Sequence, residues 1–243
     1  MIFCWGVSAQ SIKVTSELWP PHFTTPQSDG LYEAIIRRAF PDHEIEFIYL
    51  PYYRSVQAVR TSKADLWLGS YLNEVPEALY PNHFFDVDEV SALHLQETPF
   101  NLADSLLHHP LGWIKGYEYQ TYYPQIPKHN IYSLSSLEVG LRMLRGGRLK
   151  FVLDDKSSLQ AFLAERPTTP TRLTITTFGL LPLYPGFADT PQGRHLAALW
   201  DQQLTRMKAN GELQRLYRQF DEPYLLHLCP SEPLPLLSCV IND

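Results

Sequence analysis

The first 70 residues alternate between short apolar runs and amphipathic segments, and this alternation constrains the fold more than any other feature. Residues 12–16, 44–50 and 65–70 have the composition of buried strands. The segments between them, 31–40 and 54–63, carry apolar residues at helical spacing. A strand–helix–strand–helix–strand order is typical of a parallel sheet covered by helices. The sequence therefore predicts an α/β protein.

A second unit of the same kind follows after residue 110. Apolar runs at 111–115 and 149–153 predict two more strands, and 157–165 predicts a helix. Another helix is expected to begin at Ser135, which forms a capping-box pattern with Glu138. The chain thus repeats one architectural unit without repeating its sequence.

A final helical region begins at Thr190-Pro191, because proline is favoured in the first position of a helix. Asn210-Gly211 is expected to break this helix, and a shorter amphipathic helix follows. Residues 221–243 carry four prolines and are interpreted as an appended tail.

Composition excludes several classes of function. The chain has 243 residues, enough for two small domains, and its net charge of −6 leaves no electrostatic footprint for nucleic acid. No basic run exceeds two residues, which disfavours an anionic membrane surface as a partner. No cluster has zinc spacing, and no phosphate loop, dinucleotide fingerprint or nucleophile elbow is present. We therefore expect no metal and no cofactor.

The first nine residues are apolar or small and end in Val-Ser-Ala, similar to the site at which signal peptidase cuts. The segment is short and lacks a positively charged start. We interpret residues 1–9 as the remnant of a signal peptide that begins upstream, with an ordinary N-terminus as the alternative. The expected location is the periplasm.

The cysteines allow two interpretations. Without the first nine residues, Cys229 and Cys239 remain, and an even pair in an exported protein permits a disulfide. Such a bond would join parts of the proline-rich tail. Two separate thiols are the alternative.

Ligands of open α/β sheets bind beyond the carboxyl ends of the strands, and this rule selects candidate residues. The ends of the first and third strands carry Trp19, Ser70 and Tyr71. The ends of the strands at 111–115 and 149–153 carry Gly116, Tyr117 and Asp154. We expect these six residues and Arg54 to form a ligand site.

Several short signals recur in a fixed order between Ile12 and Phe220, and together they resemble the family 3 extracellular solute-binding proteins. The resemblance implies a two-lobed type II periplasmic-binding-protein architecture, in which sheets flanked by helices enclose a ligand cleft between the lobes. The signals are Val14-Thr15-Ser16-Glu17-Leu18-Trp19-Pro20-Pro21-His22-Phe23, Asp29-Gly30-Leu31, Pro51-Tyr52-Tyr53-Arg54, Lys63-Ala64-Asp65, Gly146-Gly147-Arg148-Leu149 and Asn210-Gly211-Glu212-Leu213.

The family also implies a domain division, because its chain crosses twice between the lobes. On that pattern lobe 1 holds 11–90 plus 185–222, and lobe 2 holds 91–184. Residues 223–243 form the C-terminal tail. The resemblance implies a monomer that captures a small polar ligand by hinge closure and delivers it to an ABC permease.

Each candidate residue has a structural alternative. Trp19 can stack on a ligand or cap the sheet as a core residue. Arg54 can grip a carboxylate with two parallel hydrogen bonds or form a salt bridge within lobe 1. Asp154 matches the acid that pairs with the ligand ammonium group in amino-acid-binding members. Its alternative is an N-cap for the helix at 157–165, a role that Asp155 could also fill.

The sequence departs from the family where amino-acid binders carry an arginine that clamps the ligand α-carboxylate. Residues 70–77 contain no Arg or Lys and include Glu74 and Glu77. Lys150 replaces an acid that is common in the family. A cationic or neutral ligand, such as a polyamine, a modified amino acid or a small sugar, is therefore favoured over an ordinary amino acid, although Arg54 argues the other way.

Two further functions remain as alternatives. A soluble ligand-sensing partner of a membrane receptor would have the same fold and the same kind of site. Some dehydratases also resemble solute-binding proteins, and Glu17 could serve as their general acid if burial raised its pKa. Their dianionic substrates need several cations, and the candidate residues offer only Arg54 and Lys115. We therefore expect no enzymatic activity.

Overall fold

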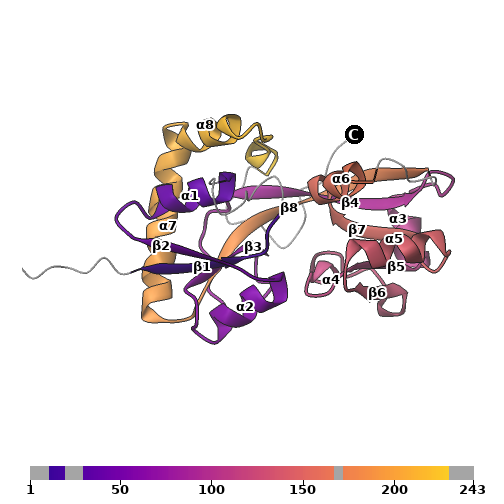
Figure 1. Cartoon of the computed structure of the whole chain (residues 1–243), viewed down its shortest axis with the longest axis horizontal. Coiled ribbons are helices and arrows are strands. Elements are labelled where there is room, and N and C mark those ends of the chain that lie inside the picture. The colour runs from indigo at the N-terminus through magenta and orange to yellow at the C-terminus, as the bar shows by residue number, and fades with distance from the viewer. Residues whose placement is uncertain (1–10, 20–29, 167–171, 230–243) are drawn as a thin grey trace, which may run out of the picture. The chain divides into compact units, whose positions relative to one another are not determined.

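A computed structural model describes residues 11–19, 30–166 and 172–229, and it divides into two compact units (Figure 1). Among these residues, unit 1 contains 11–19, 30–85 and 184–224. Unit 2 contains 86–166, 172–183 and 225–229. The chain therefore leaves unit 1 after Phe85 and returns to it at Tyr184.

The sheet of unit 1 is built on three parallel strands. β1 (Ile12–Ser16) lies between β2 (Ile45–Tyr49) and β3 (Leu66–Tyr71), and both pairings are parallel, as the sequence predicts. The full strand order is β2-β1-β3-β8-β4-β7-β5-β6, so β8 (Leu173–Phe187) follows β3.

The helices of unit 1 cover both faces of these strands (Figure 1). α2 (Tyr52–Arg60) packs on β1 and β3, whereas α1 (Leu31–Ala39) contacts α7 (Pro191–Ala209) and α8 (Glu212–Gln219). Proline occupies the first turn of α7, and the Thr190 side chain caps that helix. These features confirm the predicted helix boundary.

The core of unit 1 is aromatic where the helices meet the strands. The Trp200 ring lies 5.7 Å from the ring of Phe85 and 6.3 Å from that of Phe40, measured between centroids. The Tyr217 hydroxyl donates to the Phe85 carbonyl oxygen at 2.6 Å. All four residues are at most 1% exposed, so buried apolar area holds α7 and α8 against α1 and Phe85.

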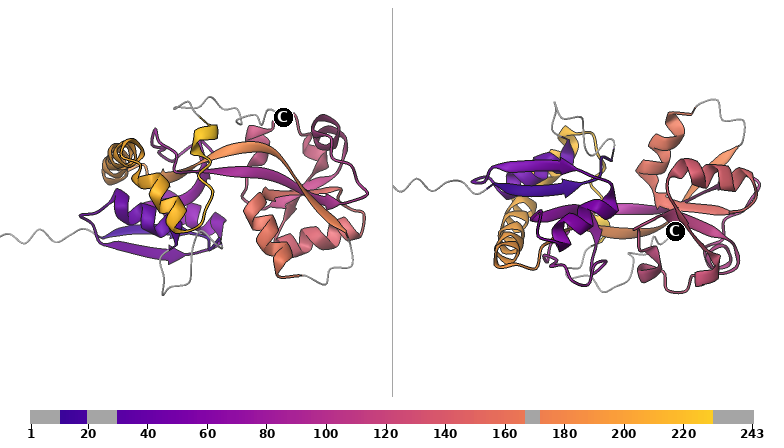
Figure 2. Two further views of the ribbon diagram at one scale, coloured as in Figure 1. Left: turned by 90° about the horizontal axis from the view of Figure 1, so that it is seen from above. Right: turned by 60° about the horizontal axis from the view of Figure 1, so that its bottom comes forward.

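Unit 2 combines parallel and antiparallel strands. β5 (Leu111–Ile114) pairs in parallel with β6 (Ile131–Leu134) and β7 (Phe151–Asp155). β4 (Asp86–Leu95) runs antiparallel to β7 and to β8 (Figure 2). The sequence patterns do not predict β4, β6 or β8.

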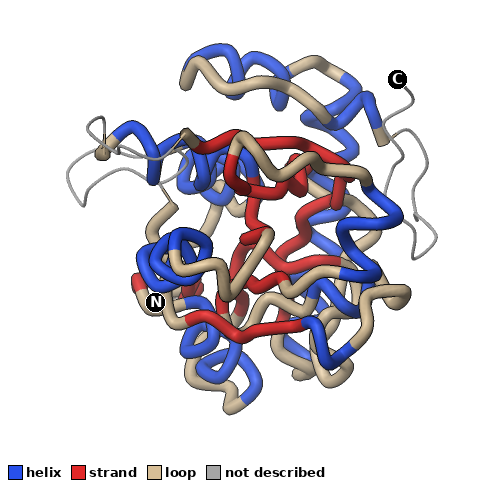
Figure 3. Tube along the Cα trace, turned by 90° about the vertical axis from the view of Figure 1, so that its right-hand side faces the viewer, coloured by secondary structure: helices blue, strands red, loops and turns tan. Residues whose placement is uncertain are grey.

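Helices flank the strands of unit 2 as well (Figure 3). α5 and α6 both pack on β4 and β7. The helical segments of this unit are α3 (Leu102–His108), α4 (Tyr119–Tyr122), α5 (Leu137–Arg145), α6 (Lys156–Ala164) and the short 3-10 turns Lys128–Asn130 and Leu226–Leu228.

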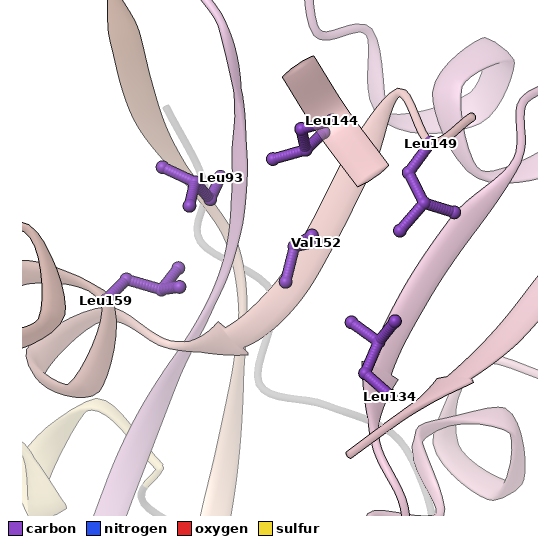
Figure 4. Packing of buried hydrophobic residues seen from close by; sticks show 6 residues of the cluster. All are labelled: Leu93, Leu134, Leu144, Leu149, Val152 and Leu159. Atoms are coloured by element: carbon purple, nitrogen blue, oxygen red, sulfur yellow. The ribbon is translucent and has the colours of Figure 1, made fainter. Parts of the chain in front are cut away.

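The core of unit 2 is aliphatic (Figure 4). The side chains in this cluster come from β4, β6, β7, α5 and α6 and from the turn before β7, and each is at most 1% exposed. Close packing of these branched side chains holds α5 and α6 against the sheet. The cluster comprises Leu93, Leu134, Leu144, Leu149, Val152 and Leu159.

The predicted capping box of α5 is wrong by one residue. Ser136, and not Ser135, is the N-cap, and its hydroxyl accepts the Val139 N–H at 3.3 Å. This register places Glu138 one position too early to reach back to the cap. Its carboxylate instead accepts from the Arg166 guanidinium at 3.2 Å.

Several predictions concern residues outside the described part of the chain. The proposed signal peptide at 1–9 and most of the tail, from residue 230 onward, are among them. Cys229 is buried and disulfide-bonded, whereas Cys4 and Cys239 are not among the described residues. No helix within 11–19, 30–166 or 172–229 is long and apolar enough to span a membrane.

We predict that Lys208 makes the stability of the protein depend on pH between about 8 and 10. Its ammonium lies 4.6 Å from the centre of the Phe84 ring, and burial lowers its pKa to about 8, although the carboxylate of Asp201 acts in the opposite direction. The same ammonium contributes to the lowered pKa of His83. The unfolded chain keeps the lysine proton until about pH 10.4, so the unfolding free energy should rise by up to about 3 kcal/mol across this window.

Urea unfolding at pH 7.5, 8.5 and 9.5 tests this expectation. The Lys208→Met variant should lose the rise, and Lys63→Met, at an exposed position, should keep it. An equal slope in the two variants would show that another group carries the pH dependence.

Candidate functional site

In unit 1, Trp19 packs against the end of β3. A Cβ atom placed on Gly69 would lie only 2.5 Å from Cη2 of the Trp19 indole. The backbone of Gly69 has a φ of +82°, a conformation that residues with a Cβ seldom adopt. The Trp19 ring also lies 6.1 Å from the Tyr52 ring and remains partly exposed. Trp19 therefore covers the strand end and still offers surface to a ligand.

A buried carboxylate organises the loop that follows β3. Glu74 is 8% exposed, and its Oε2 accepts the Ser70 hydroxyl at 3.0 Å and the Tyr71 N–H at 3.2 Å. The Tyr52 hydroxyl donates to the same oxygen. Three donors on Oε2 offset part of the loss of water around the carboxylate, which would otherwise disfavour its burial. In the sequence Glu74 stands out only as a departure from the family pattern, and no local signal predicts this role.

Two tyrosines extend this network. Burial, together with the neighbouring Glu74 carboxylate, raises the pKa of Tyr52 well above its ordinary value. Burial also raises the pKa of Tyr80, whose hydroxyl accepts the Val75 N–H at 2.9 Å and lies 3.0 Å from Ser70 Oγ. Both hydroxyls therefore stay protonated at neutral pH.

The predicted ligand residues of unit 1 occupy different environments. Ser70 and Tyr71 are buried, at 0% and 5% exposed, and both donate to Glu74. Arg54 is exposed in the first turn of α2, and no ion pair forms on its guanidinium within the described ranges. The alternative role of Arg54, a salt bridge within lobe 1, is therefore not seen among these residues.

Glu17 stabilises the start of α2. Its Oε2 accepts the Tyr52 N–H at 3.1 Å, and this amide is one of the donors that a helix leaves without an intrahelical partner. Partial burial raises the pKa of Glu17, and the same hydrogen bond acts in the opposite direction. The residue considered as a general acid therefore caps a helix from the end of the neighbouring strand.

In unit 2, Gly116 forms a tight turn at the end of β5. Its φ of +101° suits glycine, and the following Tyr117 N–H donates to the Ile114 carbonyl at 3.1 Å. The helix after this turn, α4, has only four residues. Tyr117 is partly exposed, and its ring lies 6.1 Å from that of Tyr119.

The end of β7 separates the roles of two adjacent acids. Asp155 caps α6, because its Oδ2 accepts the N–H groups of Ser157 at 2.8 Å and Ser158 at 3.2 Å. Asp154 is 4% exposed, and its Oδ1 accepts the Asp155 N–H at 2.8 Å. The capping alternative for Asp154 is therefore wrong, because its neighbour performs that role.

No metal centre accompanies these groups in the part of the chain that the structure describes. No set of three or more His, Cys, Asp or Glu side chains there could hold an ion. The strand ends described above carry aromatic surface, carboxylates and hydrogen-bonding groups.

Comparison with solved structures identifies the fold, although no protein-family model and no curated protein matches the sequence. A histidine kinase sensor domain with similarity to periplasmic binding proteins matches with a TM-score of 0.72 at 12% identity, covering 87% of this chain and 96% of that one. An ancestral arginine-binding protein bound to arginine matches with a TM-score of 0.68 at 15% identity, covering 86% and 97%.

A third neighbour is a substrate-binding protein of an ABC uptake transporter from Streptococcus pneumoniae with bound histidine. It matches with a TM-score of 0.67 at 13% identity, covering 86% of this chain and 92% of that one. The fold class is thus the two-lobed α/β architecture of type II periplasmic binding proteins, as the sequence resemblance implies. At these identities the likeness shows the fold, and function requires a separate argument.

We predict that Gly69→Ala destabilises unit 1 by about 1–3 kcal/mol, because it adds backbone strain and a contact with Trp19. Gly211→Ala is a matched control in the same unit. Gly211 also has a positive φ, of +71°, but its added Cβ would meet only the end of the Arg215 side chain at 3.4 Å. Denaturant unfolding should show a clearly smaller loss for Gly211→Ala. Equal losses would mean that the indole moves aside without cost.

Proposed function

We propose that this protein captures a small polar solute outside the cytoplasm and delivers it to an ABC-type permease. The observation that carries the proposal is the buried carboxylate of Asp154 at a strand end, where ligands of α/β sheets bind, while Asp155 performs the local capping. A buried carboxylate at the end of a strand suits recognition of a polar ligand.

The fold neighbours support this class of function. Among them are structures of an arginine-binding protein with arginine and of an ABC uptake substrate-binding protein with histidine. We propose by analogy that both units of this monomeric protein contribute ligand contacts and that hinge closure buries the ligand. We further propose that it is exported by a signal peptide.

The contacts we propose differ between the units. In unit 1, Trp19 covers the ligand body, and Arg54 donates to a polar group. In unit 2, Gly116 allows close approach of the backbone, Tyr117 borders the ligand and Asp154 accepts from it. Ser70 and Tyr71 support the site from behind, because their hydrogen bonds run to Glu74.

A second candidate function is a soluble sensor that reports ligand binding to a membrane receptor. The observation that favours it is the likeness to a histidine kinase sensor domain, at a TM-score of 0.72. Both functions need the same ligand site, and they differ in the protein that recognises the ligand-bound form. Capture of the ligand-bound protein by a permease in reconstituted vesicles would favour uptake.

A thermal-shift screen tests the proposed binding. Amino acids, amines, sugars and small carboxylates are each added to residues 10–243 at a large excess. A ligand that binds only the folded state adds about 2.7 kcal/mol of stability at one hundred times its Kd. A midpoint that no compound moves would contradict the proposed solute-binding function.

We predict that Asp154→Asn lowers the affinity for the best compound of that screen at least tenfold. The change removes the charge and keeps an oxygen that can accept the Asp155 N–H, so the melting temperature should change little. Asp155→Ala is the matched control, because it removes the cap of α6 and should cost about 1 kcal/mol of stability with unchanged affinity. Calorimetric titration of both variants makes the measurement. Unchanged affinity in Asp154→Asn would remove Asp154 from the site.

A further inference from the structure

Hydrogen-bond donors at the strand ends of unit 1 are already bound to carboxylates of the protein. The Tyr52 N–H, at the start of α2, donates to Glu17 at 3.1 Å. At the end of β3, the Ser70 hydroxyl and the Tyr71 N–H donate to Glu74 at 3.0 and 3.2 Å. Such amides and hydroxyls are the groups that would hold an anionic ligand. Glu17 and Glu74 thus occupy the positions that a ligand carboxylate would need.

The charges of these two acids also disfavour an anion. Glu74 is buried and Glu17 is partly buried, so water screens their charges less than it screens a surface charge. A ligand carboxylate at the same strand ends would meet like charge and would compete for donors that are already used. A ligand cation would instead be attracted, and its presence would offset the burial that raises the pKa of Glu17.

The turn at Gly116 in unit 2 also has few hydrogen-bond donors for an anion. The Tyr117 N–H is used within the turn, where it donates to the Ile114 carbonyl at 3.1 Å. The helix that follows is a single turn of four residues, so its dipole is short. At the neighbouring strand end stands the carboxylate of Asp154, which is 4% exposed.

We propose that the ligand is a small organic cation, an amine or guanidine without a free carboxylate, and that Glu74 is the positioning residue that sets this preference. This inference rests on the proposed binding function and names its ligand class. The partly exposed indole of Trp19 covers the ligand body, since an indole face attracts organic cations. Glu74 acts through Tyr52, Ser70 and Tyr71 and does not itself contact the ligand.

Arg54 is the charge that opposes this assignment. Its guanidinium is exposed at the first turn of α2, so its field is largely screened by water. A guanidinium also donates to neutral oxygen atoms. Arg54 therefore contributes a hydrogen bond at the edge of the site without requiring a ligand carboxylate.

Matched pairs of compounds test the ligand class on the unaltered protein. Each pair joins an amine to the amino acid that differs from it only by a carboxylate, namely 1,4-diaminobutane with ornithine, agmatine with arginine, and tyramine with tyrosine. Calorimetric titration should show one amine binding at least tenfold more tightly than its amino acid. An amino acid that binds as tightly as its amine, or more tightly, would overturn this inference and leave the binding function intact. The inference also fails if no member of any pair binds while the wider screen finds a carboxylate or a sugar. If the wider screen finds no ligand at all, the proposed binding function itself fails.

Variants of the β3–β4 loop test the role of Glu74. Glu74→Gln removes the buried charge, so the ratio of amine to amino-acid affinity should fall at least fivefold. Glu77→Gln, in the same loop but with a side chain that is 62% exposed, is the matched control and should leave the ratio unchanged. An unchanged ratio in a folded Glu74→Gln protein would remove Glu74 from this role. If that variant does not fold, the compound pairs on the unaltered protein still decide the ligand class.

Arg54→Ala separates the inference from its competitor. If the ligand is a cation, Arg54→Ala removes one hydrogen bond and should weaken amine binding by no more than about tenfold, and the amine should still bind more tightly than its amino acid. The opposite result is that the unaltered protein binds amino acids more tightly than amines, and that Arg54→Ala loses at least tenfold in affinity for the amino acids only. That result would show that Arg54 clamps a carboxylate and would overturn the proposal.

Discussion

The buried carboxylate of Glu74 is the interaction on which the candidate binding surface of unit 1 depends. One oxygen accepts from the end of β3 through Ser70 and Tyr71 and from α2 through Tyr52. A carboxylate buried away from water is costly without hydrogen-bond donors. These hydrogen bonds therefore hold the end of β3, the start of α2 and the loop that carries Glu74 in one arrangement. The position of Trp19 follows from it, since the indole lies between Tyr52 and the end of β3.

The same physical rule gives different results for the other acids near the strand ends. Glu17 and Asp155 each lie close to the first amides of a helix and satisfy those donors. Asp154 lies beside Asp155 but does not cap α6, and its Oδ1 accepts the Asp155 N–H. Counting the acids near the strand ends is therefore a poor guide to the ligand. The hydrogen-bond donors that each acid already accepts are more informative.

The long strand β8 shows where sequence patterns mislead. β8 contains Pro182 and Pro185 together with Gly179 and Gly186, residues that normally argue against a strand interior. It is nevertheless a strand of 15 residues. Its glycines allow close packing, because a Cβ on Gly186 would lie only 2.1 Å from the Trp67 ring. Tertiary contacts of this kind override local propensity, and no alternation in the sequence records them.

The sequence by itself determined the local elements. The periodicity of 12–70, the proline at the start of α7 and the break at Asn210-Gly211 each specify backbone conformation through residues adjacent in the chain. It also selected the strand ends as the place for ligand chemistry. Only the tertiary structure decided which hydrogen-bond donor each acid engages, since Tyr52 is 22 residues from Glu74 and 35 from Glu17. Partners so distant in sequence are chosen by packing, so the sequence alone does not show which donors a carboxylate will bind.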